Sequence, residues 1–490
     1  MKIVQCITTL IYHVAPYDPT LWMARAEHLL RLGYPELCIG DATKALVLAS
    51  RFAAKDVRGY MNITVSTCLR IYSESKTLEG LWDTMKKQLS GIVIRSRLIL
   101  CEGMLYCQAY WDLNGMARDS MYVSKDVDPT AAARFMRFAL LAQKGMADLE
   151  VTRPIDITDE QWMEISRSGL INDKPYPWMS EDMIIRSTTS LTNMMLQATT
   201  KCEVRDSAIS GRLGKNCLGV FARGAMKKNK VFLVDRAAVA AAGPADDGMW
   251  RSCTTCFNDL EASAGAMVCC EMQYCSQECS TAALQTFHAL LCGRQFEFIA
   301  QDRSVRGRRR TRFAMLMARV IACAMAEGSA ISHPLMSSLL VPLQGRYEES
   351  PFGNCVDLTL LLDWMNRILN EFGGDVWIDK QWDTWVIQTI ISRLDQNSYP
   401  FPMGSFGKGG VTINLRRCLF NHSCNPNVDL GRVGKTTVAM TALRKIERGE
   451  ELTVSYGGPD VVDAFYSLRQ QFLISHLPNG CKCDRCEEEK

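Results

Sequence analysis

The chain has 490 residues, enough for two to four domains that each bury a core of their own. A hydrophobic content of 47% and a charged content of 22% are those of an ordinary globular protein. The net charge of +3 predicts no strong preference for nucleic acid or for acidic partners. No run approaches the roughly 18 apolar residues that a membrane helix needs, so no membrane partner is expected.

Cysteine is unusually frequent, with 21 residues. Eleven of them fall in two clusters with metal-like spacing, one from Cys253 to Cys292 and one at Cys424 and Cys481–Cys486. The scattered cysteines lie in apolar runs and are interpreted as buried thiols. Metal-binding and free thiols together predict a reducing compartment, the cytoplasm or the nucleus or both.

Residues 1–204 are predicted to be helical, and the short apolar start is interpreted as a buried helix and not as a signal peptide. Small residues follow an aromatic one at helical spacings between residues 21 and 49, a pattern typical of a tetratricopeptide repeat. The pattern consists of Trp22, Ala26, Gly33, Cys38 and Ala45. A weaker second unit spans residues 98–122, where a plain helical bundle is the favoured interpretation. A short helix is also expected after Thr158, where Thr158 and Gln161 have capping-box spacing.

From about residue 205 the pattern becomes β-rich, with strands expected at residues 219–223 and 230–234 on either side of a polar turn. The first of the two cysteine clusters follows at residues 251–295. Its pairs are spaced so that each can bind one zinc ion from a knuckle or from a single helical turn. These pairs are Cys253 with Cys256, Cys275 with Cys279, and His288 with Cys292, and Cys269 and Cys270 are adjacent between them.

Residues 296–395 are predicted to be mainly helical. The arginines at 303–312 form either a nuclear-localisation run, a patch for an anionic partner or a solvated helix start, and the last of these is favoured. Strands are expected again at 411–414, 438–443 and 452–456, and a final helix at 461–475.

The motif Asn421-His422-Ser423-Cys424 precedes a strand that ends in Tyr456 and a tail with the pattern Cys481-x-Cys483-x2-Cys486. Three tail thiolates leave one position of a tetrahedral zinc site open, and Cys424 is the nearest upstream candidate for it. A shared ion would hold the tail over the Asn-His segment and close a pocket there.

In this order the motifs resemble the SET- and MYND-domain protein-lysine methyltransferases, with a tetratricopeptide-like extension in front. The resemblance implies an α+β fold with a split SET domain. Its expected parts are the helical region 1–204, the first SET part 205–250, the MYND zinc finger 251–295, a helical insert 296–395, the second SET part 396–460 and a post-SET helix and zinc tail 461–490.

The resemblance also implies the cofactor S-adenosylmethionine, two or three zinc ions and a protein substrate with a target lysine, histone or otherwise. The implied cofactor-binding residues are Gly219, Asn421, His422 and Tyr456. Tyr456 is also expected to orient the amine, whereas Tyr399 either lines the lysine channel or packs in the core. In the finger, the resemblance assigns Cys253, Cys256, Cys275 and Cys279 to one zinc, and His288, Cys292 and Cys269 or Cys270 to the other.

The aromatic pair that the family carries just before its tail cysteines is absent, and His476 or Phe472 is the candidate to replace it. The alternative to an enzyme is therefore a catalytically silent adaptor. Such an adaptor would bind partner peptides through the zinc finger and the helical repeats. Nucleic-acid binding is the weaker third possibility because the net charge is small.

Overall fold

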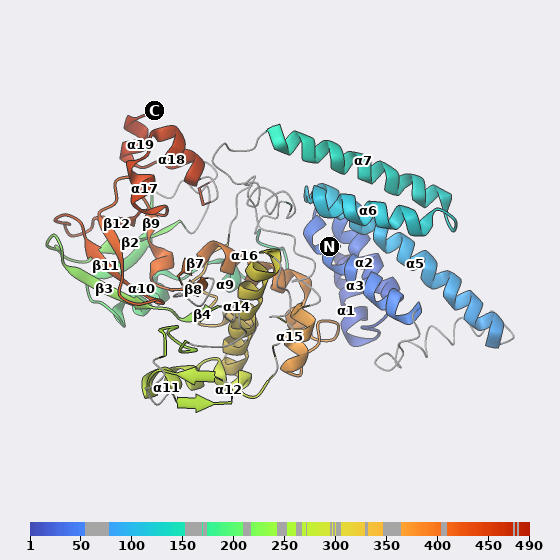
Figure 1. Ribbon diagram of the computed structural model, residues 1–490, viewed down its shortest axis with the longest axis horizontal. Coiled ribbons are helices and arrows are strands. Elements are labelled where there is room, and N and C mark those ends of the chain that lie inside the picture. The colour runs from blue at the N-terminus through green and yellow to red at the C-terminus, as the bar shows by residue number, and fades with distance from the viewer. Residues whose placement is uncertain are drawn as a thin grey trace. The chain divides into compact units, whose positions relative to one another are not determined.

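The structure, a computed structural model, divides into two compact units (Figure 1). One consists of Met1–Ile171 with Gly353–Gln388, and the other of Asn172–Phe352 with Thr389–Lys490. The residues described are 1–53, 78–151, 169, 174–208, 217–242, 252–260, 267–270, 272–294, 296, 299, 305–328, 332–345, 364–402, 409–473, 476–477 and 480–490. The helix expected after Thr158 lies outside them.

The first unit is helical, as predicted for the N-terminal region. The helices Pro19–Arg31 and Pro35–Ala53 form an antiparallel pair. The small residues at their contact are fully buried, as are Trp22 and Cys38. Gly33 lies in the turn with φ +81°, a conformation that favours glycine. The helices are α1 (Lys2–His13), α2 (Pro19–Arg31), α3 (Pro35–Ala53), α5 (Leu78–Tyr106), α6 (Tyr110–Ser124), α7 (Pro129–Val151) and α15 (Met365–Glu371). The assignment of the pair as a tetratricopeptide repeat stays a prediction.

A cluster of charges is buried inside this unit. Arg25 of α2 donates to Asp41 of α3 at 2.6 Å and to Asp383 at 2.8 Å. Lys44 of α3 donates to the carbonyl oxygen of Val376 at 3.0 Å, and its ammonium lies 4.1 Å from the ring centre of Trp22. These contacts fix the segment around residues 375–383 against α2 and α3, although the sequence assigns it to the SET insert.

The second unit is built on small sheets (Figure 1). Its central sheet has the strand order β1-β2-β12-β9, a second has β10-β11-β3, a third has β4-β8-β7, and β5 pairs with β6. The strands are β1 (Cys202–Asp206), β2 (Leu218–Ala222), β3 (Val231–Arg236), β4 (Val239–Ala241), β5 (Met267–Cys269), β6 (Met272–Tyr274), β7 (Ser398–Phe401), β8 (Gly410–Ile413), β9 (Asn421–His422), β10 (Val428–Arg432), β11 (Thr437–Ala442) and β12 (Glu451–Val454).

Two neighbours in the sequence, β2 and β3, belong to different sheets. β2 pairs with β1 and β12, whereas β3 pairs with β11. The polar turn between them is thus a crossover between sheets and not a hairpin. The strand β9 is parallel to β12, with Asn421 opposite Thr453 and His422 opposite Val454. This pairing brings the Asn-His motif beside the strand that leads to Tyr456.

The core of the sheet region comes from alternating strand residues, among them Val220, Leu233, Met440 and Leu452, which are nearly inaccessible to solvent. The helices of this unit are α9 (Glu181–Ile184), α10 (Thr188–Leu196), α11 (Gln277–Gln285), α12 (His288–Leu291), α14 (Val305–Glu327), α17 (Gly458–Asp463), α18 (Tyr466–Leu473) and α19 (Asp484–Glu488). The helix α16 (Thr384–Asn397) carries the boundary between the units. No helix among the described residues is both long and apolar enough to cross a bilayer.

The single helix predicted at 461–475 is wrong: the chain forms α17 and α18, because Ala464 between them has an extended backbone, with ψ 159°. The short helices α11 and α12 lie beside the β5–β6 hairpin and form the small module that holds the first cysteine cluster (Figure 1).

Candidate functional site

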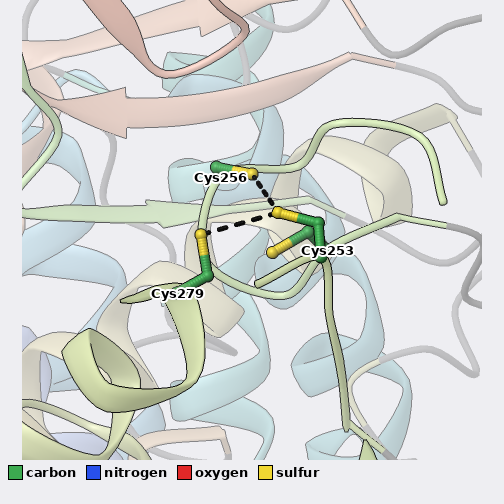
Figure 2. A group of neighbouring side chains, drawn as sticks. Cys253, Cys256 and Cys279 are labelled. Carbon is green, nitrogen blue, oxygen red and sulfur yellow. Dashed lines mark hydrogen bonds between the residues drawn. The ribbon is translucent and has the colours of Figure 1, made fainter. Parts of the chain in front are cut away.

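The first metal-like group lies in the finger module. The sulfur atoms of Cys253, Cys256, Cys275 and Cys279 all lie within 4.8 Å of one another. Figure 2 shows Cys253, Cys256 and Cys279 with their thiols turned toward one another. The sulfur of Cys275 lies 3.5 Å from that of Cys256 and 3.7 Å from that of Cys279. Ser276 caps α11 by accepting the backbone N–H of Cys279 at 3.2 Å, which fixes that ligand at the first helical turn. Four converging thiols fit a tetrahedral zinc ion.

The second group unites Cys269, Cys270, His288 and Cys292, whose ligand atoms also lie within 4.8 Å of one another. The sequence left open which of the two adjacent cysteines contributes, and the structure brings both into the group. Cys270 has φ +52°, a left-handed conformation that is uncommon outside glycine. Among the described residues, the buried Nε2 atom of His288 has no hydrogen-bond partner, and a nitrogen in this position fits a metal ligand.

The third group lies in the tail. Cys424, Cys481, Cys483 and Cys486 are all buried, with their sulfur atoms within 4.8 Å of one another. Several N–H groups point at these sulfurs: the backbone of Cys424 donates to Cys483 at 3.4 Å and Gln470 donates to Cys486 at 3.3 Å. Donors aimed at sulfur fit thiolates that hold a cation. The predicted role of Cys424 as the upstream partner of the tail agrees with this geometry.

Asn421 is held by its side-chain amide. The Nδ2 atom donates to the carbonyl oxygen of Leu218 at 3.0 Å and to Oε1 of Glu451 at 2.8 Å. Gly219 lies directly beside this pair: a Cβ there would be 2.3 Å from Oε1 of Glu451 and 3.0 Å from Nδ2 of Asn421. A side chain at 219 would displace the ends of these two side chains, so glycine leaves room for them to meet. Glu451, which the sequence gave no site role, positions Asn421.

The ring of His422 is engaged within the protein. Nδ1 accepts the backbone N–H of Tyr456 at 3.0 Å, and Nε2 lies 3.2 Å from the sulfur of Cys424. Burial lowers the pKa of His422 to about 4, so the ring is neutral at physiological pH. The imidazole is not among the described groups that line the cleft below. The predicted contact of His422 with the cofactor stays a prediction.

The turn that leads into Asn421 is anchored by a buried carboxylate. Asp235 of β3 is inaccessible to solvent and accepts the backbone N–H groups of Arg416 at 3.0 Å and Arg417 at 2.9 Å. Burial raises the pKa of Asp235, while these bonds and the Arg416 guanidinium oppose the rise. The anchored turn places the Arg417 guanidinium 3.2 Å from the ring centre of Tyr399.

A cleft opens beside Asn421. Its lining includes Arg186, Leu218, Gln344, Asn397, Tyr399, Cys418, Asn421, Tyr456 and His476. Tyr456 donates its hydroxyl to the carbonyl oxygen of Phe420 at 3.0 Å. Burial raises the pKa of Cys418 to about 12, so this thiol is protonated. The structure thus brings Tyr399, Asn421 and Tyr456, which the sequence singled out, together around one cleft. Arg186 and Gln344 were missed because they lie far from every motif.

A second cavity adjoins the same tyrosine. It is lined by Tyr456, Gly457, Val461, Phe472, Leu473 and His476. Tyr456 and His476 line both cavities, and their rings meet edge to face with centres 5.6 Å apart. Phe472 lines only the second cavity. Of the two candidates for the missing aromatic wall, His476 is therefore the one that lies against Tyr456.

Comparison with known proteins places this site in a family. The SET-domain family model matches residues 218–457. A SET and MYND domain-containing protein of Dictyostelium discoideum is 25% identical over 251 residues, which cover 48% of this chain and 70% of that protein. A SET domain and MYND-type zinc finger protein of Schizosaccharomyces pombe is 23% identical over 49% of this chain and 44% of its own length.

A third relative, a histone-lysine N-methyltransferase of Yarrowia lipolytica, is 37% identical over 93 residues, or 18% of this chain and 20% of that protein. The matched region holds every strand except β1, most of the cleft lining and the Asn-His motif. The names of two relatives join a SET domain to a MYND finger, and in this chain the first two cysteine groups lie within the matched region. Over residues 218–457 the chain belongs to the SET-domain family, and it is similar to proteins that join a SET domain to a MYND finger.

Proposed function

We propose that the protein is an S-adenosylmethionine-dependent protein-lysine N-methyltransferase. The observation that carries this function is the position of Tyr456, whose ring lines two adjoining cavities while its hydroxyl is held by the Phe420 carbonyl at 3.0 Å. One cavity, beside Asn421, suits the cofactor. The other, lined mainly by apolar side chains, suits the aliphatic stem of a lysine.

When bound, the cofactor supplies a methyl group on a positively charged sulfur. Methyl transfer from it to an amine needs no metal and no covalent enzyme intermediate, so the protein acts by positioning. Holding two reactants in line is worth roughly 7–11 kcal/mol of barrier. The Tyr456 oxygen is the polar atom at the junction, and it orients the amine and stabilises the developing charge.

The tail zinc site supports the same pocket from outside. His422 joins Cys424 to the Tyr456 backbone, and His476, five residues before Cys481, covers the Tyr456 ring. Zinc bound by the four tail cysteines would hold both contacts in place. In this way a structural metal serves the geometry of the cleft without taking part in the reaction.

The proposal also includes three zinc ions per chain and a protein substrate with a target lysine. The proposed compartment is a reducing one, cytoplasmic or nuclear. The three converging groups of ligands support the ion count. Thiol-rich metal sites favour a reducing compartment. The finger and the helical pairs of the first unit are the proposed sites for partner peptides.

The test is calorimetric binding of S-adenosylmethionine to the zinc-loaded full chain. We expect micromolar binding by the wild type, loss of binding in Asn421→Ala and retained binding in Tyr456→Phe, which still has its ring and backbone. Asn425→Ala is the matched control because this asparagine of the same motif is exposed. Tyr456→Phe should in turn abolish transfer of a radiolabelled methyl group to protein substrates.

Failure of the folded wild type to bind the cofactor would overturn the enzyme function. The catalytically silent adaptor would then be the leading alternative, with the SET core as a scaffold for the finger and the helices.

A further inference from the structure

We propose that Arg319 is the counter-cation of the first finger group, the thiolates of Cys253, Cys256, Cys275 and Cys279. Arg319 lies on α14 and belongs to no cysteine motif. This role rests on the zinc proposed for that group and not on the methyltransferase activity.

Arg319 is a buried cation without a carboxylate partner among the described residues. Its side chain is 3% exposed, and its Nε atom has no hydrogen-bond partner there. The acidic neighbours that act on it are Tyr274, Cys323 and Cys253. Burial lowers the pKa of Arg319 to about 10, so the guanidinium is still charged at neutral pH. Burying a charge is costly unless an opposite charge accompanies it.

One of these three neighbours can supply the opposite charge. Burial raises the pKa of Cys323 to about 12 and also raises the pKa of Tyr274, so both side chains are neutral at pH 7. Cys253 differs from them because a thiol must lose its proton to bind zinc. Four thiolates around a divalent ion form a doubly negative group. The zinc-loaded first finger group is therefore the anion that fits Arg319.

The guanidinium contacts the finger and a sheet at the same time. Its Nη1 donates to the backbone carbonyl of Thr254, in the loop of the first ligand pair, at 3.0 Å. The same atom donates to the carbonyl of Ala240 in β4 at 2.5 Å. Its central carbon lies 4.5 Å from the ring centre of Phe287 and 5.3 Å from that of Phe257. Aromatic faces attract a cation but carry no net charge, so they do not replace an anion.

The loop of the first ligand pair also packs against the third sheet. Phe257 of this loop meets Phe401 of β7 with ring centres 5.2 Å apart. The strand β7 carries Tyr399, which lines the cleft. A counter-cation that favours the zinc-loaded loop thus also favours its packing against the strand of Tyr399.

The experiment titrates the zinc-loaded full chain with a chromophoric chelator, which reports how tightly each ion is held. Cys275→Ser identifies the step of the first finger group, because Cys275 belongs to that group and to neither of the others. We expect Arg319→Met to weaken this step by about 10- to 100-fold, the usual loss when a partner of metal ligands is removed. Arg319→Lys should keep most of the affinity, because it keeps the charge.

Arg393→Met is the matched control. Arg393 is also buried and donates to two backbone carbonyls, those of Leu340 and Met183, neither of which belongs to a cysteine group. Its replacement should leave the first step unchanged.

Thermal unfolding gives a second readout with opposite signs in two backgrounds. In the zinc-loaded wild type, Arg319→Met should lower the midpoint of unfolding, because the anionic group loses its counter-cation. In the Cys275→Ser background the same change should raise the midpoint. There the arginine is a buried charge without its anion, and an apolar side chain of similar length removes that cost.

Equal weakening of the first step in Arg319→Lys and Arg319→Met would overturn the inference, because the arginine would then act through its contacts and not through its charge. So would a titration in which Cys275→Ser removes no step. If Arg319→Met does not fold, recovery of folding and of the first zinc ion in Arg319→Lys supports the inference, and no recovery overturns it. Cofactor binding by the wild type is measured separately, so failure here leaves the proposed methyltransferase activity standing.

Discussion

His422 connects Tyr456 to a tail metal ligand. Its Nδ1 accepts the Tyr456 backbone N–H at 3.0 Å, and its Nε2 lies 3.2 Å from the sulfur of Cys424. Because Nδ1 accepts, the neutral ring carries its proton on Nε2, which donates toward the sulfur. A single side chain thus couples the position of the tyrosine to the geometry of the tail.

We expect His422→Ala to reduce the free energy of unfolding of the second unit by about 1–3 kcal/mol, since a backbone N–H loses its acceptor. Cofactor affinity should fall with it, because Tyr456 is no longer fixed. The comparison variant is His333→Ala, whose Nδ1 also accepts one backbone N–H, that of Leu335 at 3.2 Å, away from the cleft. Equal cofactor affinity in the two variants, measured by calorimetry, would contradict the coupling.

Gly219→Ala should weaken the cofactor site from within the central sheet. The added Cβ would lie 2.3 Å from Oε1 of Glu451, so Glu451 or Asn421 must move. Overpacking of this kind costs typically about 1–3 kcal/mol of stability. Gly224→Ala is the matched control, because nothing lies within 4 Å of the added atom there. Chemical unfolding and cofactor titration of both variants test the difference, and equal behaviour would show that the sheet absorbs the methyl group.

Whether the sequence predicted a feature of the fold or the site depends on how far apart in the chain its residues lie. The cysteine groups followed from spacing, because thiols two or three residues apart can share one ion. The glycine at 219 was predicted as a site residue, but its reason, Glu451, lies 232 residues away in the sequence and could not be read locally. Arg186 carried no signal at all, since only the fold brings its linker to the cleft.

The strand register shows the same limit. Alternating apolar residues predicted β2 and β3, yet their pairing with β12 and β11 depends on tertiary contacts that a linear pattern does not contain. The segment around residues 375–383 is a further case: it was assigned to the SET insert, but buried charges tie Asp383 to Arg25 of the helical unit.

His476→Ala should lower cofactor affinity by about 2- to 12-fold, the loss that corresponds to one aromatic pair. The reason is that His476 lines both cavities and meets the Tyr456 ring at 5.6 Å. Phe472→Ala, which alters the second cavity alone, should leave cofactor affinity unchanged and impair substrate methylation. Calorimetry and a methylation assay on both variants show which side chain takes the place of the missing aromatic pair. The reverse pattern would assign this role to Phe472.

Cys270→Ser should lower the zinc count from the proposed three to two, because both adjacent cysteines belong to the second finger group. A site with three ligands left binds zinc far less tightly than one with four. Metal analysis after dialysis measures the count, with Cys202→Ser as the control because this buried thiol lies outside all three groups. A count that stays at three in Cys270→Ser would show that Cys269 alone suffices.

Lys44 predicts an unusual pH dependence in the helical unit. Burial lowers its pKa from 10.5 to about 8, against the opposing pull of Asp383 and Asp41. Between these two values the unfolded chain binds more protons than the folded one, so the free energy of unfolding rises with pH there, by up to about 1.4 kcal/mol per pH unit. Below pH 8 the cost of burying the charge is fully present.

Lys44→Met should abolish this rise, because methionine does not titrate and fills a similar volume. We expect the wild-type free energy of unfolding minus that of Lys44→Met to increase from pH 7.5 to pH 9.5. Urea unfolding followed by circular dichroism of the helices measures both values. The exposed Lys125→Met is the control and should give a constant difference, since this side chain is exposed in the folded chain. A constant difference for Lys44→Met as well would mean that Asp383 and Asp41 keep the buried ammonium charged throughout.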